Sequence, residues 1–360
     1  NGRRFEGQDI PVGEETTAAM ERVTKLLDDL AGQMDPAAPW EMPGAAELDQ
    51  VTFSSWLDEH CDNAEARDNI ALYVGPAMLT KPVHAFSALQ AVLMAASAGS
   101  FSNLVDADFI LDRRISGGLQ SVPVQLAERL GDRVRLGCDV SSIEWSATGA
   151  VVHVDREAFE ARDVILALPP THVQRIRFTP ALPAVHGQAR QHQSFGLVIK
   201  VQARYDTPFW RPDGLSGTGF GPYELVHEVY DNTLDGDTGG TLVGFVSDVH
   251  ADALTLLSPD ERRTRVLASI QAYFGASAGS PLSYVESGWA SEELTGGAYG
   301  TSFGVGGLTR FGAVLKESVG PLHFGSSDVA GLGFQHVDGA VRVGTALAEK
   351  LSRPTGTPRT

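Results

Sequence analysis

Apolar positions recur along this 360-residue chain with two periods, one typical of helices and the other of strands. Residues 14–34 carry apolar side chains three and four positions apart, which predicts a helix with one apolar face. Residues 84–98 form a second apolar run, and we expect a helix there too. The apolar face of the first helix consists of Met20, Val23, Leu27 and Leu30.

Strand patterns follow in two groups. Short runs rich in β-branched and aromatic residues, bounded by polar residues or by Gly and Pro, predict strands. Because these runs interleave with the helical ones, the predicted fold class is mixed α/β. The runs cover residues 133–136, 140–145, 151–154 and 164–168 in the first group, and 197–203, 225–230 and 241–246 in the second.

Polar residues at the segment ends indicate where two further helices begin. Thr52 is a candidate N-cap for a short helix that follows it. Ser258, Pro259 and Glu261 occupy the N-cap, first and third positions of another helix, the pattern of a capping box. Gly275 is expected to end that helix, because glycine adopts the backbone conformation of a helix C-terminus without strain.

The segment 321–344, PLHFGSSDVAGLGFQHVDGAVRVG, predicts a short strand, a turn of small residues, an acidic residue, a loop and then a helix. A turn of this kind before a helix presents unpaired backbone N–H groups, which suit an anionic or electron-rich ligand. An ordinary loop fits the same pattern. The predicted helix carries Val337, Ala340, Val341 and Gly344 on one face.

Charge and composition restrict the function. The 45 Asp and Glu outnumber the 28 Lys and Arg, giving a formal net charge of −17. An acidic protein lacks the basic surface that nucleic acids require, whereas its field would attract a cationic substrate. An acidic globular protein that binds no cationic substrate would have the same excess of negative charge. The length exceeds what one hydrophobic core normally serves, so two domains are expected.

Cysteine, histidine and hydropathy patterns argue against several other classes. Cys61 and Cys138 are far apart, so neither a disulfide framework nor a zinc site is indicated, and Cys138 is expected to be buried filler. The ten histidines are scattered without metal-ligand spacing. The sequence has no apolar run of membrane-spanning length and no signal-peptide pattern, so a cytoplasmic location is predicted.

Long stretches of the chain resemble the flavin-dependent amine oxidases of the monoamine oxidase family. The resemblance covers nearly all 360 residues. It is carried by residues 114–145 (RISGGLQSVPVQLAERLGDRVRLGCDVSSIEW), 163–170 (DVILALPP), 194–210 (SFGLVIKVQARYDTPFW), 288–300 (GWASEELTGGAYG) and the C-terminal segment 321–344.

A narrower similarity points to the actinobacterial putrescine oxidase subgroup of that family. It implies FAD-dependent oxidative deamination of a primary diamine: hydride passes from the amine to the flavin, the imine is hydrolysed, and O2 is reduced to hydrogen peroxide. A monoamine or cyclic amine as substrate remains an alternative. The similarity rests on residues 86–102 (FSALQAVLMAASAGSFS), 214–221 (GLSGTGFG), 225–233 (LVHEVYDNT) and 333–344 (GFQHVDGAVRVG).

The resemblance also implies two interleaved domains. An FAD-binding domain would take residues 114–188 and 294–360, and a substrate domain would take residues 1–113 and 189–293, with a mixed sheet. No G-x-G-x-x-G stands between a strand and a helix here, so the family's dinucleotide-binding unit is expected outside this sequence. An inactive fragment unable to hold FAD is therefore a further alternative, and a homodimer is expected only from the family.

Four residues match positions that act on the amine in this family. The resemblance implies that Lys200 holds a water near flavin N5 and that Glu228 pairs with the distal ammonium of a diamine. Tyr299 and His336 would form the pair that orients the reacting amine in front of the flavin. His336 departs from the family, which usually has tyrosine there, and an imidazole can titrate near neutral pH.

Other residues match positions that contact the flavin. Because Ala298 stands where some relatives carry a flavin-linking cysteine, the FAD is expected to be non-covalent. Val140 would offer backbone hydrogen bonds to adenine, and Trp289 would pack beside the isoalloxazine ring. Asp328, assisted by Ser327, would meet the ribityl hydroxyls or the phosphate edge, and the N–H of Val337 would face the flavin O2/N1 edge.

Each of the main candidates also has an ordinary structural explanation. Lys200 could be an edge-strand lysine that reaches solvent, and Glu228 could be a solvated carboxylate. Tyr299 and Trp289 could be core aromatics. His336 could simply be the residue before a helix.

Overall fold

The computed structural model describes residues 10–110 and 113–352. Helices and strands interleave along the chain, so the mixed α/β class is confirmed. The chain divides into two compact units, each assembled from three separated segments. Unit 1 comprises Asn1–Leu26, Ala46–Ala91 and Ser194–Gly306, and unit 2 comprises Leu27–Ala45, Val92–Gln193 and Gly307–Thr360.

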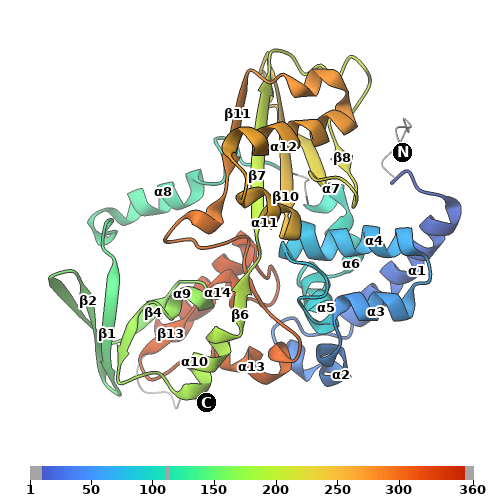
Figure 1. Ribbon diagram of the computed structural model, residues 1–360. Helices are drawn as coiled ribbons and strands as arrows, with labels where there is room; N and C mark the ends of the chain where they lie inside the picture. The colour runs from blue at the N-terminus through green and yellow to red at the C-terminus, as the bar shows by residue number, and fades with distance from the viewer. Residues whose placement is uncertain (1–9, 111–112, 353–360) are drawn as a thin grey trace. The chain divides into compact units, whose positions relative to one another are not determined.

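Unit 1 is built on a five-stranded sheet in which every pair of neighbours is antiparallel. The long strands β7 and β10 form its centre (Figure 1). In spatial order the strands are β11 (Ser283–Ser287), β7 (Val198–Tyr205), β10 (Gly240–Ser247), β9 (Glu228–Asp231) and β8 (Gly219–Phe220).

One face of this sheet is covered by helices. Alternate residues of β7, including Val201 and Ala203, are fully buried in a core shared with α11 (Asp248–Thr255) and α12 (Pro259–Phe274). Because side chains alternate across a strand, the intervening residues of β7, Lys200 among them, project from the opposite face. The sequence pattern therefore produces one apolar face and one polar face.

Further helices complete unit 1. The π-helical segment η2 (Tyr73–Leu79) contains Pro76 and ends at Thr80, whose φ of 54° is left-handed. The other helices are α2 (Ala45–Gln50), α3 (Phe53–His60), α4 (Ala64–Leu72), the 3-10 turns η4 (Ala276–Gly279) and η5 (Trp289–Ser291), and parts of α1 (Glu14–Ala31) and α5 (Ala88–Ser97), which continue into unit 2. A short pair joins β6 (Gln193–Phe195) to β12 (Thr301–Phe303).

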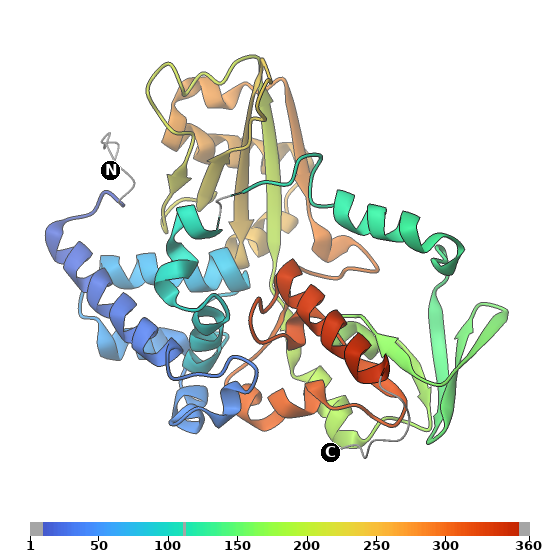
Figure 2. The same cartoon turned by 180° about the vertical axis from the view of Figure 1, so that it is seen from behind.

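Unit 2 contains a four-stranded sheet and a separate parallel pair. The sheet has the order β3 (Glu157–Ala161), β2 (Gly149–Val154), β1 (Val140–Ser146) and β5 (Arg177–Thr179). The pair consists of β4 (Val164–Leu166) and β13 (Leu322–Phe324), and Figure 2 shows this part of the chain from behind. Both contribute to one core, which includes Ile143, Leu166 and Phe324.

In the sequence, the helices of unit 2 lie before, between and after these strands. The longest, α14 (Val337–Ser352), follows the turn after β13. The others are η1 (Pro39–Glu41), α6 (Phe101–Val105), α7 (Ala107–Ile110), α8 (Ser121–Leu130), η3 (Gly131–Arg133), α9 (Pro170–Val173), α10 (Ala184–Gln191), α13 (Gly307–Lys316) and η6 (Ser327–Val329).

Most sequence predictions of elements are confirmed, with shifted ends. The Thr52 cap accepts the Ser55 N–H at 3.0 Å, and the capping box of Ser258 and Glu261 forms at the start of α12. The helix predicted at 84–98 begins only at Ala88, after a hydrogen-bonded turn.

Two predictions are wrong, and one predicted strand begins three residues late. Residues 133–136 form no strand, and Leu136 is 88% exposed, because no neighbouring strand pairs with this apolar run. Cys138 is exposed rather than buried. The strand predicted from Leu225 starts at Glu228, because Leu225 and Val226 lie in the turn before it, with Val226 in the core below the sheet.

Candidate functional site

Three neighbouring strands of unit 1 place Lys200, Phe245 and Glu228 in one row. Phe245 of β10 lies directly opposite Lys200 of β7 on one side and Glu228 of β9 on the other. Directly paired residues of antiparallel strands point to the same face, which here is the face opposite the α12 core. With neighbouring strands about 4.8 Å apart, the backbones of Lys200 and Glu228 are about 10 Å apart.

Glu228 is a buried carboxylate without a cationic partner among the described residues. It is 7% exposed, and its Oε2 accepts a hydrogen bond of 2.8 Å from the Tyr230 hydroxyl. The Nδ1 atom of His227 lies 3.9 Å from Oε1, but burial lowers the pKa of His227 to about 4, so this ring is neutral at pH 7. Burial raises the pKa of Glu228 to about 7, against the opposing effect of the Tyr230 hydrogen bond.

Aromatic rings surround this carboxylate. Phe220 of β8 pairs directly with Glu228, and the ring of Tyr73 stacks on Phe220 at 4.5 Å. Desolvation, and then the charge of Glu228, raise the pKa of Tyr73 to about 12 and also raise the pKa of Tyr299. Electron-rich ring faces beside a carboxylate form a site that suits an alkylammonium ion.

At the other end of this row, Lys200 and Tyr299 both lie against the ring of Phe245. The Lys200 Nζ lies 5.3 Å from the centroid of the Phe245 ring, in a cation–π arrangement. The Tyr299 ring meets Phe245 edge to face, with centroids 6.5 Å apart, and 45% of the tyrosine is exposed. Phe245 therefore contacts both predicted residues and lies between Lys200 and Glu228 in the row.

Ala298 and Trp289 complete the predicted residues of unit 1. Ala298 is 8% exposed, and its carbonyl accepts a 2.6 Å hydrogen bond from Thr80 Oγ1. Its methyl side chain offers no thiol to a flavin. Trp289 opens the short helix η5, which contacts β7, and is 50% exposed, so it is not an ordinary core residue.

The turn after β13 in unit 2 holds Ser327 and Asp328. The Ser326 side chain accepts the Asp328 N–H at 3.3 Å, and its hydroxyl donates to Asp328 Oδ2 at 3.0 Å. Asp328 is 9% exposed, so its carboxylate is fixed and largely withdrawn from solvent. The Ser327 carbonyl accepts the Gln335 N–H at 3.0 Å, which closes the loop before α14.

His336 and Val337 stand at the start of α14. The carbonyl of His336 accepts the Ala340 N–H at 3.2 Å, and its Nδ1 lies 2.8 Å from the Phe334 carbonyl. Val337 is the first helical residue, and the N–H groups of a first turn have no partner within the helix. A Cβ on Gly339 would overlap the Gly333 carbonyl, so this close approach requires glycine.

These residues of unit 2 suit a flavin. A helix N-terminus next to a fixed acid supplies donors for an electron-rich ring edge and an acceptor for hydroxyl groups. Val140, the first residue of β1, packs against the same core as Phe324, at the end of β13. Unit 2 therefore carries both the backbone N–H groups and the carboxylate that suit a flavin.

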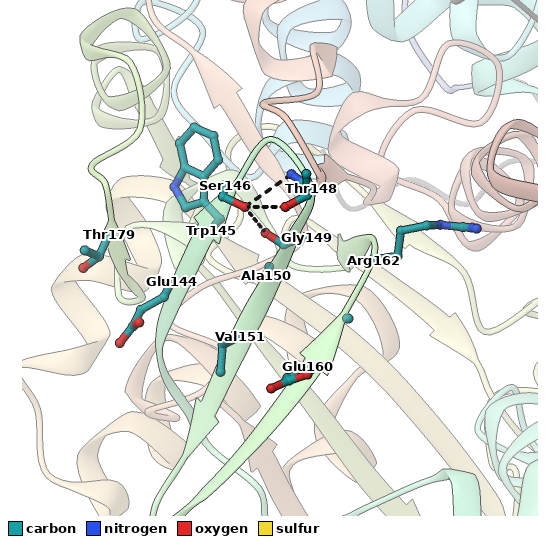
Figure 3. A pocket seen from close by; sticks show the side chains of 11 residues that line it. Glu144, Trp145, Ser146, Thr148, Gly149, Ala150, Val151, Glu160, Arg162 and Thr179 are labelled. Atoms are coloured by element: carbon teal, nitrogen blue, oxygen red, sulfur yellow. Dashed lines mark hydrogen bonds between the residues drawn. The ribbon is translucent and has the colours of Figure 1, made fainter. Parts of the chain in front are cut away.

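A second group of carboxylates lines an open hollow of about 640 Å³ in unit 2 (Figure 3). Glu144 and Glu160 point from β1 and β3, and Arg162 lies at the edge. The Glu144 side chain is 62% exposed and lies 3.2 Å from His153. Exposed ion pairs contribute only about 0–1 kcal/mol, so this hollow is a weaker ammonium site than Glu228.

Sequence reasoning missed four aromatic residues of the site: Tyr73, Phe220, Tyr230 and Phe245. Tyr230 lies two residues after Glu228 on the same strand, so alternation could have identified it. The other three come from different segments, and only the strand pairing and the position of η2 bring them to Glu228.

The described residues contain neither a cluster of metal ligands nor a membrane-spanning helix. Across residues 10–110 and 113–352, no three His, Cys, Asp or Glu side chains are grouped to bind a metal ion. No helix in the same ranges is both long and apolar enough to cross a bilayer.

Comparison with known proteins identifies the family of this chain. Residues 1–352 match the family model of flavin-containing amine oxidoreductases. The chain is 51% identical over 359 residues to putrescine oxidase from Kocuria rosea, covering 96% of this chain and 75% of that protein.

Solved structures show the same relationship. A wild-type putrescine oxidase bound to putrescine superimposes with a TM-score of 0.95 at 54% identity, covering 98% of this chain and 79% of the other. Cyclohexylamine oxidase from Brevibacterium oxydans IH-35A gives 0.86 at 28% identity, covering 96% and 77%. The chain therefore belongs to the flavin-containing amine oxidase family, enzymes that use FAD as cofactor.

Proposed function

We propose that this enzyme oxidatively deaminates a primary aliphatic diamine, with putrescine as the reference substrate. The observation that supports this most directly is Glu228, a buried carboxylate surrounded by aromatic rings and lacking a cationic partner among the described residues. The similarity to putrescine oxidases supports the same substrate. The products would be 4-aminobutanal, which cyclises to 1-pyrroline, with ammonia and hydrogen peroxide.

The two amines of a diamine match the two ends of the row formed by Lys200, Phe245 and Glu228. The reacting amine must be neutral to release hydride, whereas the distal amine stays charged and binds the ionised Glu228. A charge-assisted hydrogen bond contributes about 1.5–3 kcal/mol, which corresponds to a preference of roughly 10- to 100-fold over a monoamine. Substrate then lies along Phe245, with its reacting carbon toward Lys200 and Tyr299.

The remaining residues have supporting roles in this proposal. When bound, FAD would supply the redox chemistry, as the acceptor of the hydride and the source of electrons for O2. Lys200 holds a water beside the reacting centre, and Tyr299 and His336 orient the amine. The flavin would be held by Ser327, Asp328, Val337, Val140 and Trp289, and Ala298 would leave it non-covalent.

The cytoplasmic location and the homodimer expected from the sequence stay predictions.

The test compares Glu228→Gln with the unmodified enzyme on putrescine and on butylamine, which has the same chain length but no second amine. We expect the variant to lose 10- to 100-fold in kcat/KM on putrescine and to change less than about twofold on butylamine. Hydrogen peroxide release measures both. Glu144→Gln, which removes a strand carboxylate from the hollow of Figure 3, is the control and should behave like the unmodified enzyme.

Three outcomes contradict the proposal. An equal loss on both amines would show that Glu228 supports the site as a whole rather than a distal ammonium. A larger turnover of cyclohexylamine than of putrescine by the unmodified enzyme would favour a cyclic amine oxidase. A colourless purified protein that takes up no added FAD would favour the inactive fragment.

A further inference from the structure

Unit 1 contains a buried lysine that the proposed reaction does not use. Lys81 is 6% exposed, and its Nζ donates to Ser194 Oγ at 3.0 Å, to Ser302 Oγ at 2.7 Å and to the Ser302 carbonyl at 3.2 Å. All three acceptors are uncharged. Burial lowers the pKa of Lys81 to about 8, so the amine is still mostly charged at pH 7. A buried charge without a counter-ion is costly, which argues that the position has a specific purpose.

The preceding residue joins the same chain segments through its backbone. The Thr80 carbonyl accepts the Leu197 N–H at 3.0 Å, and the Thr80 hydroxyl donates to the Ala298 carbonyl at 2.6 Å. Leu197 lies three residues before Lys200, and Ala298 directly precedes Tyr299. Thr80 therefore contacts the segments that carry both residues.

Two glycines show how closely these segments meet. A Cβ on Gly196 would overlap the Thr80 hydroxyl oxygen, and a Cβ on Gly297 would overlap the Phe195 ring. The Ala298 N–H also donates to the Gly196 carbonyl at 3.4 Å. The backbones of residues 79–81, 194–197 and 297–302 therefore lie in close contact. The Lys81 ammonium bonds to Ser194 and Ser302, the residues at the far ends of the two partner segments.

We propose that Thr80 and Lys81 are positioning residues, which fix the loop bearing Tyr299 against the start of the strand bearing Lys200. This inference rests on the proposed roles of Lys200 and Tyr299. The ammonium suits the task because it has three donors, and here each reaches an oxygen on one of two segments that are 108 residues apart in sequence. Misplacement of a catalytic group by about 1 Å can lower a rate by about 100-fold.

The consequence for kinetics differs from that of a binding residue. Glu228 lies on β9, which none of these contacts reach, so the anchoring of the distal ammonium should survive loss of Lys81. In contrast, the loss of Lys81 should disturb the orientation of the reacting amine. Lys81→Met is therefore expected to lower kcat about 10-fold or more while KM for the fastest amine changes less than about twofold.

Hydrogen exchange followed by mass spectrometry tests the contact itself without any substrate. In Lys81→Met, peptides covering residues 194–200 and 296–303 should exchange about 10-fold faster, and α12 should not change. The control is Lys316→Met, another lysine whose pKa burial lowers, which donates to the Ala37 carbonyl in unit 2. It should alter neither those peptides nor kcat.

Ser302→Ala provides a second variant if Lys81→Met folds poorly. It removes one of the three acceptors and should change exchange and kcat in the same direction by a smaller amount. Unchanged exchange in both peptides would overturn the proposal, and so would faster exchange with an unaltered kcat, or a raised KM at constant kcat. If no amine is oxidised, the proposed function fails, while the exchange result still decides whether Lys81 fixes these segments.

Discussion

Glu228 is expected to make the folded protein less stable as pH rises, and Glu228→Gln should remove this effect. The pKa of this carboxyl is raised by burial from 4.5 to about 7. Between these values the unfolded chain ionises the glutamate while the folded chain still holds the proton. The folded state therefore binds more protons, and the free energy of unfolding falls with increasing pH.

The size of the effect follows from the shift. About 2.5 pH units at 1.36 kcal/mol each amount to roughly 3 kcal/mol when the full shift is expressed. About 2 kcal/mol of this develops between pH 5.5 and pH 8.5, the remainder having developed at lower pH. Glutamine is neutral throughout and can still accept the Tyr230 hydroxyl hydrogen bond, so the variant should gain about 2 kcal/mol on the unmodified protein over this range.

Urea unfolding at pH 5.5, 7 and 8.5 measures this difference. Trp210 is fully buried in the core of unit 1 and reports the unfolding of that unit by fluorescence. Glu144→Gln alters an exposed carboxylate of unit 2 and should stay within about 0.5 kcal/mol at each pH. A difference that does not change with pH, or that grows toward low pH, would refute the argument that Glu228 is buried without a counter-charge.

Three further outcomes are expected from the same site. The ratio of kcat/KM for putrescine to that for butylamine should rise about 10-fold between pH 6 and pH 8 as Glu228 ionises, and a flat ratio would exclude it as the anchor. Tyr230→Phe removes a hydrogen bond that lowers the Glu228 pKa, so KM for putrescine at pH 7 should rise about threefold and recover by pH 9; a loss at both pH values would contradict this. Lys200→Met should lower kcat about 10-fold or more in rapid-mixing measurements, with KM changed less than twofold, and an unaltered kcat would remove Lys200 from the reaction.

Local signals predicted much of the fold. The capping box of α12, the Thr52 cap and the strand before α14 depend on residues within a few positions of one another, and all form as expected. The run at 133–136 shows the limit of such reasoning. A strand needs a partner, and the sequence alone does not say whether another segment lies beside it.

The candidate site was predictable only in part, because its geometry depends on long-range pairing. Lys200 and Glu228 were identified from the family resemblance, but nothing local indicates that Phe245 lies between them. The stacking of Tyr73 on Phe220 joins segments 147 residues apart. Such contacts follow from strand register and from the π-helical segment around Pro76, which no periodicity predicts.

The row of Lys200, Phe245 and Glu228 runs across the strands rather than along one of them. Its length is therefore set in whole interstrand spacings by backbone hydrogen bonds, and exchanging a side chain does not alter it. Moving the carboxylate along β9 would need steps of two residues, since a single step turns it into the core. Preference for a longer or shorter diamine should thus change in discrete jumps, by relocating the acid to another strand position, rather than by gradual adjustment of the pocket.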